Sequence, residues 1–166
     1  MKKVFLFALL LSLPFSVFAN GEKAEIDADS VTTASIVKDG DALIKALKSD
    51  GTWMVALLDD VSVKDDIVVE GEFQGKPYRK IALYTQDENR NVTNRFKLTA
   101  SKLIVRSKHT RIQSGTFIGD VVVEAMDFEL VDAKVIGNVY FKTDAQMKSF
   151  KKDESSEVTG KVEIMM

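Results

Sequence analysis

The sequence lacks cysteine altogether and contains two prolines, one histidine and one tryptophan. Without cysteine the chain forms no disulfide or thiolate metal site, and it offers no cysteine nucleophile or lipid attachment point. A single histidine excludes a metal site built from an imidazole cluster. His109 lies in a polar turn without the Ser and Asp pattern of a catalytic triad, and no Gly-rich phosphate loop is present. The sequence therefore predicts no catalytic residue, no cofactor and no bound metal.

The charge balance also limits the possible partners. The chain carries 23 Lys and Arg against 25 Asp and Glu, and without the segment Met1–Ala19 the counts become 21 and 25, a net charge of −4. Nucleic-acid binding requires a basic patch, so we expect no nucleic-acid partner. Beyond Ala19 no apolar run is long enough to span a bilayer.

The N-terminal segment Met1–Ala19 has the three parts of a secretory signal peptide. Lys2 and Lys3 precede an apolar run over residues 4–13, and residues 17–19 end in Ala19 before Asn20. An uncleaved membrane anchor is the alternative. Cleavage near Ala19 predicts a secreted, periplasmic or extracellular protein of 147 residues (166 less 19), enough for one domain. We assign residues 20–38 to a flexible leader, with a loosely docked arm as the alternative, and 39–166 to the domain.

The domain is expected to open with one short helix and continue in short strands. Residues 41–49 carry apolar side chains at helical spacing, with an N-cap candidate before them and Gly51 after them. Apolar runs predict strands at 53–58, 61–63, 67–70, 80–85, 96–98, 102–106 and 158–164. Residues 73–79 and 86–91 are expected to be loops, and residues 144–152 one or two helical turns.

An internal repeat with a constant period stands out between Arg111 and Lys142. Shifting this stretch by one repeat superimposes apolar and glycine positions: Ile112 on Leu130, Phe117 on Val135, Ile118 on Ile136, Gly119 on Gly137, Val121 on Val139 and Val123 on Phe141. Similar apolar triplets begin at Ile67, Ile81, Leu103, Val121, Val139 and Val162. Units of this kind bury their apolar side chains by stacking on their neighbours.

The repeat predicts an all-β fold, a single-stranded parallel β-helix of about six coils of about 18 residues. Glycine just before the triplets suits tight corners, and the helix at 41–49 would cap the first coil. A left-handed hexapeptide helix has coils of the same length, but its six-residue period is not clean here, so the right-handed form is favoured.

Two families share features with these residues. The pattern in residues 118–124, 136–142 and 158–164 resembles bactofilin-type solenoids, the polymer-forming β-helices of bacteria. The opening helix, apolar strand and the segment at residues 66–71 look like the start of pectate-lyase-type right-handed β-helices. Both resemblances imply a parallel β-helix from about residue 39 onward, although the lyases are much longer and their catalytic residues find no match here.

Alternation within the triplets places one charged and one apolar column on the outer face. Arg106, Glu124 and Lys142 form the charged column. The apolar column contains Val68, Ala82, Ile104, Val122 and Tyr140. Residues 145–150 or the first helix could cover it, the alternation could be wrong at one strand, or the column could be a binding surface, since exposed apolar patches mark such sites. We take Val68, Ile104, Val122 and Tyr140 as the candidate interaction surface.

Other polar clusters admit two interpretations. Asp59–Asp60 and Asp65–Asp66 could hold Ca²⁺ or act as acid and base, but adjacent Asp residues are also ordinary turn residues. Trp53 is expected in the core. If the protein binds acidic glycans, the candidate contacts are Tyr78, Arg79, Arg106 and Lys108.

The last strand, residues 161–166, has no clear capping segment after it, and an uncapped strand edge is a template for pairing. The alternative is that residues 144–152 fold back as a cap. We therefore expect a non-enzymatic structural or interaction protein of the bacterial cell envelope, associating through its ends or the apolar stripe with a second copy or an envelope protein. The alternative function is a small carbohydrate-binding or lyase-like protein acting on acidic glycans, which rests on fold analogy.

Overall fold

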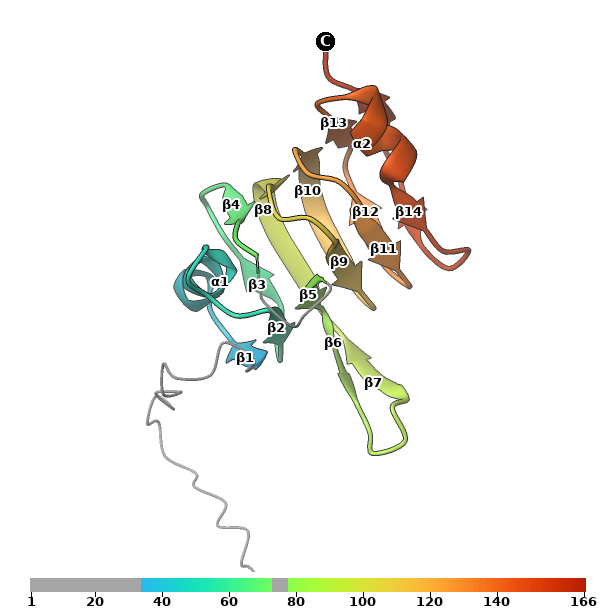
Figure 1. Cartoon of the computed structure of the whole chain (residues 1–166). Helices are drawn as coiled ribbons and strands as arrows, with labels where there is room; N and C mark the ends of the chain where they lie inside the picture. Colours follow the sequence, from blue (N-terminus) through green and yellow to red (C-terminus); the bar gives the residue numbers. More distant parts are fainter. Residues whose placement is uncertain (1–33, 73–77) are drawn as a thin grey trace, which may run out of the picture.

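The computed structural model describes residues 34–72 and 78–166 of the chain (Figure 1). The expected signal peptide, residues 1–19, and residues 20–33 of the expected leader lie outside the described residues. Residues 34–37, at the end of the expected leader, form β1 (Ala34–Val37), which pairs in parallel with β2 (Met54–Leu57).

Three sheets make up the described chain. The first is parallel, in the order β1, β2, β5 (Arg79–Ala82), β9 (Thr110–Gln113), β11 (Glu129–Val131) and β14 (Lys151–Lys152). The second has the order β15 (Glu157–Val158), β12 (Lys134–Ile136), β10 (Thr116–Val123), β13 (Val139–Phe141) and β16 (Val162–Ile164). In the same sheet β8 (Lys97–Val105) lies beside β10, while β3 (Val61–Ser62) and β4 (Ile67–Val69) lie beside β8. The third is the antiparallel hairpin of β6 (Tyr84–Gln86) and β7 (Val92–Arg95).

The predicted single-stranded β-helix of about six coils is therefore wrong. The described part of the chain forms two parallel sheets and one antiparallel sheet. The sequence pattern placed the triplet at Ile81 between those at Ile67 and Leu103, but Ile67 pairs directly with Leu103, and Ile81 lies in the other sheet beside Val55 and Ile112. The hairpin accounts for part of this stretch, and Figure 1 shows it projecting away from the sheets.

The register expected from the repeat is confirmed where the sequence repeat is clearest. Ile112 pairs with Leu130, Phe117 with Val135 and Val121 with Val139. Side chains from both parallel sheets meet in one apolar core, in which Phe117, Phe128, Phe141, Ile81 and Leu103 are completely buried. The repeat therefore sets which side chains stack, because parallel strands align residues one repeat apart.

Left-handed backbone conformations recur at the same spacing and turn the chain between strands. His109 and Asp127 have φ values of 52° and 59°, Ser114 and Asp132 have 58° and 50°, and the members of each pair lie one repeat apart. At Gly137 φ is 152°, and a Cβ there would lie 2.0 Å from the carbonyl oxygen of Gly119. Only glycine fits such a close approach, so this corner depends on it.

The helix expected after Asp39 is present as α1 (Gly40–Leu47), and the Asp39 side chain caps it by accepting a hydrogen bond of 2.9 Å from the Ala42 amide. Leu43, Ala46 and Leu47 are buried against the first strands, and α1 lies beside β1, β2 and β4. The helix thus covers the N-terminal end of the sheets (Figure 1).

Candidate functional site at the C-terminal edge

Arg79 was a candidate glycan contact, but the structure places it in the interior with 2% of its surface exposed. Its guanidinium donates to the carbonyl oxygens of Leu47 at 2.8 Å, Ala46 at 3.0 Å and Thr52 at 2.8 Å, and also to that of Glu70. Burial lowers the pKa of Arg79 to about 10, so it remains charged at neutral pH. Arg79 is therefore a clasp that holds the end of α1, and it is not accessible to a glycan.

The other candidate glycan contacts do not form one site. Arg106 lies between Glu124 at 3.0 Å and Glu70 at 3.2 Å, and the carboxylate of Glu124, followed by that of Glu70, raises the pKa of Arg106. Tyr78 packs edge-on against Trp53, with Arg111 over its ring at 4.8 Å. Lys108 is exposed. Of the two arginines proposed for uronate binding, one is buried and the other already holds two carboxylates.

The candidate apolar surface is continuous but only partly accessible. Val68, Ile104, Val122 and Tyr140 lie next to one another on β4, β8, β10 and β13, as predicted. Val122 is 8% exposed and the other three are half-buried. Ala82 is not part of the column, because β5 belongs to the other parallel sheet. The predicted charged column is confirmed, since Lys142 reaches Glu124 at 3.5 Å beside Arg106.

The aspartate pair Asp59–Asp60 accepts hydrogen bonds from backbone amides. Asp59 accepts a hydrogen bond from the Asp60 amide, and Asp60 accepts one of 2.8 Å from the Lys97 amide. Across residues 34–72 and 78–166, no group of three or more His, Asp or Glu side chains is placed to hold a metal ion.

A different region combines unpaired backbone with exposed apolar side chains. We call β14, β15 and β16 the C-terminal edge. Each of these strands pairs on one side only, with β11, β12 and β13 respectively, and no other strand of the described chain pairs with its outer side. Nine large apolar residues of the described chain are exposed, and four of them, Val162, Ile164, Met165 and Met166, lie in β16 or directly after it. Unpaired strands with apolar side chains favour association with another chain.

The backbone hydrogen-bonding groups of β16 alternate between the side that faces β13 and the outer side. The carbonyl of Lys161 accepts from the Val139 amide, and the Met165 amide donates to the carbonyl of Phe141, each at 2.8 Å. In a parallel ladder successive residues alternate between the two sides, so the N–H and C=O groups of Val162 and Ile164 point away from β13. These two residues present hydrogen-bonding groups to the outside, while Glu163 bonds inward to β13.

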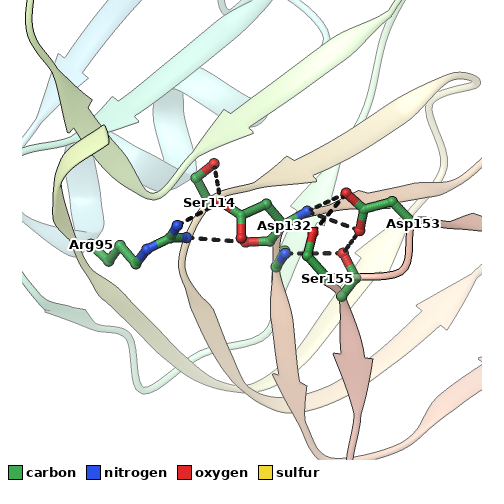
Figure 2. Close-up of polar contacts among 7 residues, drawn as sticks. Arg95, Ser114, Asp132, Asp153 and Ser155 are labelled. Atoms are coloured by element: carbon green, nitrogen blue, oxygen red, sulfur yellow. Dashed lines mark hydrogen bonds and ion pairs between the residues drawn. The ribbon is translucent and has the colours of Figure 1, made fainter. Parts of the chain in front are cut away.

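A polar network holds β14 and β15 in place (Figure 2). The Asp153 carboxylate accepts two hydrogen bonds from the Asp132 amide, at 3.1 and 3.0 Å, and others from the hydroxyls of Ser155 and Ser156. The Ser156 hydroxyl makes the largest contribution to lowering the pKa of Asp153. Ser156 also accepts a hydrogen bond of 3.0 Å from the buried Ala133 amide. The turn between β14 and β15 is therefore fixed to the layer before it.

The same network borders a shallow polar hollow of about 200 Å³. Arg95 at the base of the hairpin pairs with Asp132 at 2.7 Å, and Lys134 pairs with Glu157 at 2.9 Å (Figure 2 shows the first of these pairs). These four charged side chains pair with one another. The two ion pairs therefore connect the hairpin and β15 to the rest of the protein.

Residues 144–152, expected either to cap the end or to leave it open, extend the sheet. The helix α2 (Asp144–Ser149) has no buried residue and lies beside β13 and β16. Phe150 stacks on Phe128 at 5.7 Å and contacts Phe141 at 5.4 Å. The next two residues form β14, whose outer side remains unpaired within the described chain. The segment thus closes the core with one aromatic ring but leaves the strand edges accessible.

Comparison with known proteins gives no relative: no family model, no curated protein and no solved structure matches the chain. The resemblances to bactofilins and pectate lyases therefore stay predictions. No helix in the described part of the chain is long and apolar enough to cross a membrane.

Sequence reasoning identified the open last strand but missed the residues that organise it. Asp132 and Ser114 lie one repeat apart, and Asp153 follows Asp132 by slightly more than one repeat, so the repeat could have indicated a stack of polar turns. The sequence did not predict the two-residue strand β14, because the two lysines that form it do not show the residue pattern of a strand.

Proposed function

We propose that the protein is a non-enzymatic interaction protein of the bacterial cell envelope that binds another protein chain through its C-terminal edge. The observation that carries the proposal is the coincidence of three unpaired strand edges with the apolar side chains of Val162, Ile164 and Met165. Hydrogen bonding along a strand edge supplies affinity and the side chains supply selectivity.

Export to the envelope is part of the proposal and rests on residues 1–19. Expression in a bacterial host followed by fractionation and intact-mass measurement tests it. A periplasmic or secreted product that begins at Asn20 is expected. A full-length product in the cytoplasm would contradict it.

Association is tested by light scattering coupled to size exclusion on residues 20–166 over a wide concentration range. We expect the average mass to rise with concentration for the unaltered chain and to stay monomeric for Val162→Lys. The matched control is Ile36→Lys, because Ile36 is 59% exposed and lies on β1, at the opposite end of the first parallel sheet from β14. Equal behaviour of the two variants would exclude the edge as the binding surface.

The alternative function, binding of acidic glycans, has weaker support. Its candidate Arg79 is buried and Arg106 is neutralised by Glu70 and Glu124. A binding isotherm with polygalacturonate, measured on the unaltered chain and on Arg106→Ala, tests it, and saturable binding lost in the variant would revive it.

A further inference from the structure

The two ends of the sheets differ, and the difference restricts how copies of the chain could meet. At the N-terminal end α1 packs beside β1, β2 and β4. The clasp of Arg79 on the carbonyls of Ala46 and Leu47 holds it there. The C-terminal edge of one copy would have to displace this helix to reach the N-terminal end of another. Head-to-tail stacking is therefore disfavoured, and the contact that remains is C-terminal edge against C-terminal edge, which requires a two-fold axis.

Charge distinguishes the possible axes. An axis through β14 would place Lys151 and Lys152 against the same residues of the second copy, and like charges directly opposite one another are destabilising. An axis through β15 would bring β16 toward those lysines, with Lys161 and Glu163 both near them, so the facing charges would be only partly complementary. An axis through β16 exchanges the other two strands, so the lysines of β14 face Glu157 on β15 of the second copy.

The register along β16 follows from the same argument. If Val162 lies on the axis, Lys161 faces Glu163 of the second copy on both sides of it. The N–H and C=O groups of Val162 point outward, as an antiparallel hydrogen-bonded pair requires. Backbone geometry and charge therefore select the same register.

We propose that two copies of the chain form a closed dimer about a two-fold axis at Val162, with β16 antiparallel to β16 of the second copy and β14 beside its β15. This inference rests on the proposed function and names the partner as a second copy. It predicts that association stops at the dimer, because the contact occupies the C-terminal edge of both copies.

The absence of cysteine makes cross-linking a clean test. In the proposed register the Cα atoms of the two Val162 residues are about 5.5 Å apart, within the range of a disulfide. Residues 20–166 carrying Val162→Cys, oxidised with copper phenanthroline at a concentration that gives dimers, should become covalent dimers. Glu163→Cys is the register control, because its two copies would be roughly 8 Å apart, too far for a disulfide. Ile36→Cys, on β1 at the other end, should also stay uncross-linked.

A charge exchange tests the second contact independently. Lys151→Glu with Lys152→Glu in one chain, or Glu157→Lys in another, should each raise the dimer dissociation constant about tenfold, because each places like charges opposite one another. Mixing the two variants should restore dimers, since the heterodimer recovers opposite charges at both contacts. Circular dichroism and urea midpoints verify that each variant is folded.

The outcomes separate the two proposals. Masses that stay monomeric at every concentration would overturn the proposed function and the dimer together. Association through the edge without cross-linking of Val162→Cys, or growth beyond the dimer, would overturn the two-fold arrangement alone. Association in which the mixed charge variants do not recover would exclude the contact between β14 and β15.

Discussion

Arg79 should be one of the most important residues for stability, although it is a charged residue in a strand. Replacing it by methionine keeps much of the side-chain volume and removes the guanidinium. The hydrogen bonds to the carbonyls of Ala46, Leu47, Lys48, Thr52 and Glu70 would be lost. We expect Arg79→Met to lower the free energy of unfolding by about 3–5 kcal/mol.

The expected loss of stability is the balance between the lost hydrogen bonds and two effects that reduce their cost. Hydrogen bonds from a charged donor stabilise by roughly 1.5–3 kcal/mol each, and releasing a buried charge recovers part of this. The carbonyls of Ala46 and Leu47 also accept from the amides of Thr52 and Glu70, so they keep one partner each. Arg79→Lys should lose less, about 1–3 kcal/mol, since an ammonium has three donors where a guanidinium has five.

The assay is urea unfolding followed by circular dichroism, with hydrogen exchange of the α1 amides as a local readout. The matched control is Arg106→Met, an exposed arginine with two ion pairs, whose midpoint should change little. A change below about 1 kcal/mol for Arg79→Met, with unaltered exchange in α1, would refute the clasp.

Three further predictions concern a corner, a carboxylate and an aromatic ring. Gly137→Ala should cost roughly 3 kcal/mol or more, because it adds strain at positive φ and a clash with a backbone oxygen. Thermal unfolding should show a large loss for Gly137→Ala and a much smaller one for the control Gly40→Ala, whose Cβ would meet a side-chain methyl of Val63 at 3.0 Å at an ordinary φ. Asp153 has a lowered pKa in the folded state, so its contribution to stability is present above its ordinary value of 3.8 and is lost as the pH falls through the folded value. Urea midpoints measured from pH 6 to pH 2 should therefore fall less steeply for Asp153→Asn than for the unaltered chain, and an unchanged profile would contradict the network. Phe150→Ala should cost about 2–4 kcal/mol and weaken association, measured by thermal unfolding and light scattering, because the ring anchors the segment that leads into β14.

Part of this structure could be predicted from the sequence because the relevant interactions are periodic. Residues one repeat apart, such as Phe117 and Val135, pair as the sequence indicates. The helix after Asp39 follows from its N-cap and apolar spacing. The number of layers could not be predicted, because the hairpin adds residues between Ile67 and Leu103 without adding a repeat unit to their sheet.

The candidate site could be predicted only in outline. The strand β16 was expected from its apolar pattern, but its neighbours β14 and β15 have two residues each, too short for any periodicity. Their placement depends on Asp153, which binds the backbone amide of Asp132, in the preceding layer. Such a contact depends on where two turns meet in space, and no local pattern encodes it.

The sequence by itself determined the register between residues 111 and 142, since alternation and the period of the repeat decide there which side chains can share a core. Only the tertiary structure decided the role of Arg79. Its hydrogen-bond acceptors on Ala46, Leu47 and Thr52 are distant in the sequence, and α1 and the strands around it bring them together. A polar side chain is buried when enough acceptors converge on it, and that convergence is a property of the folded chain.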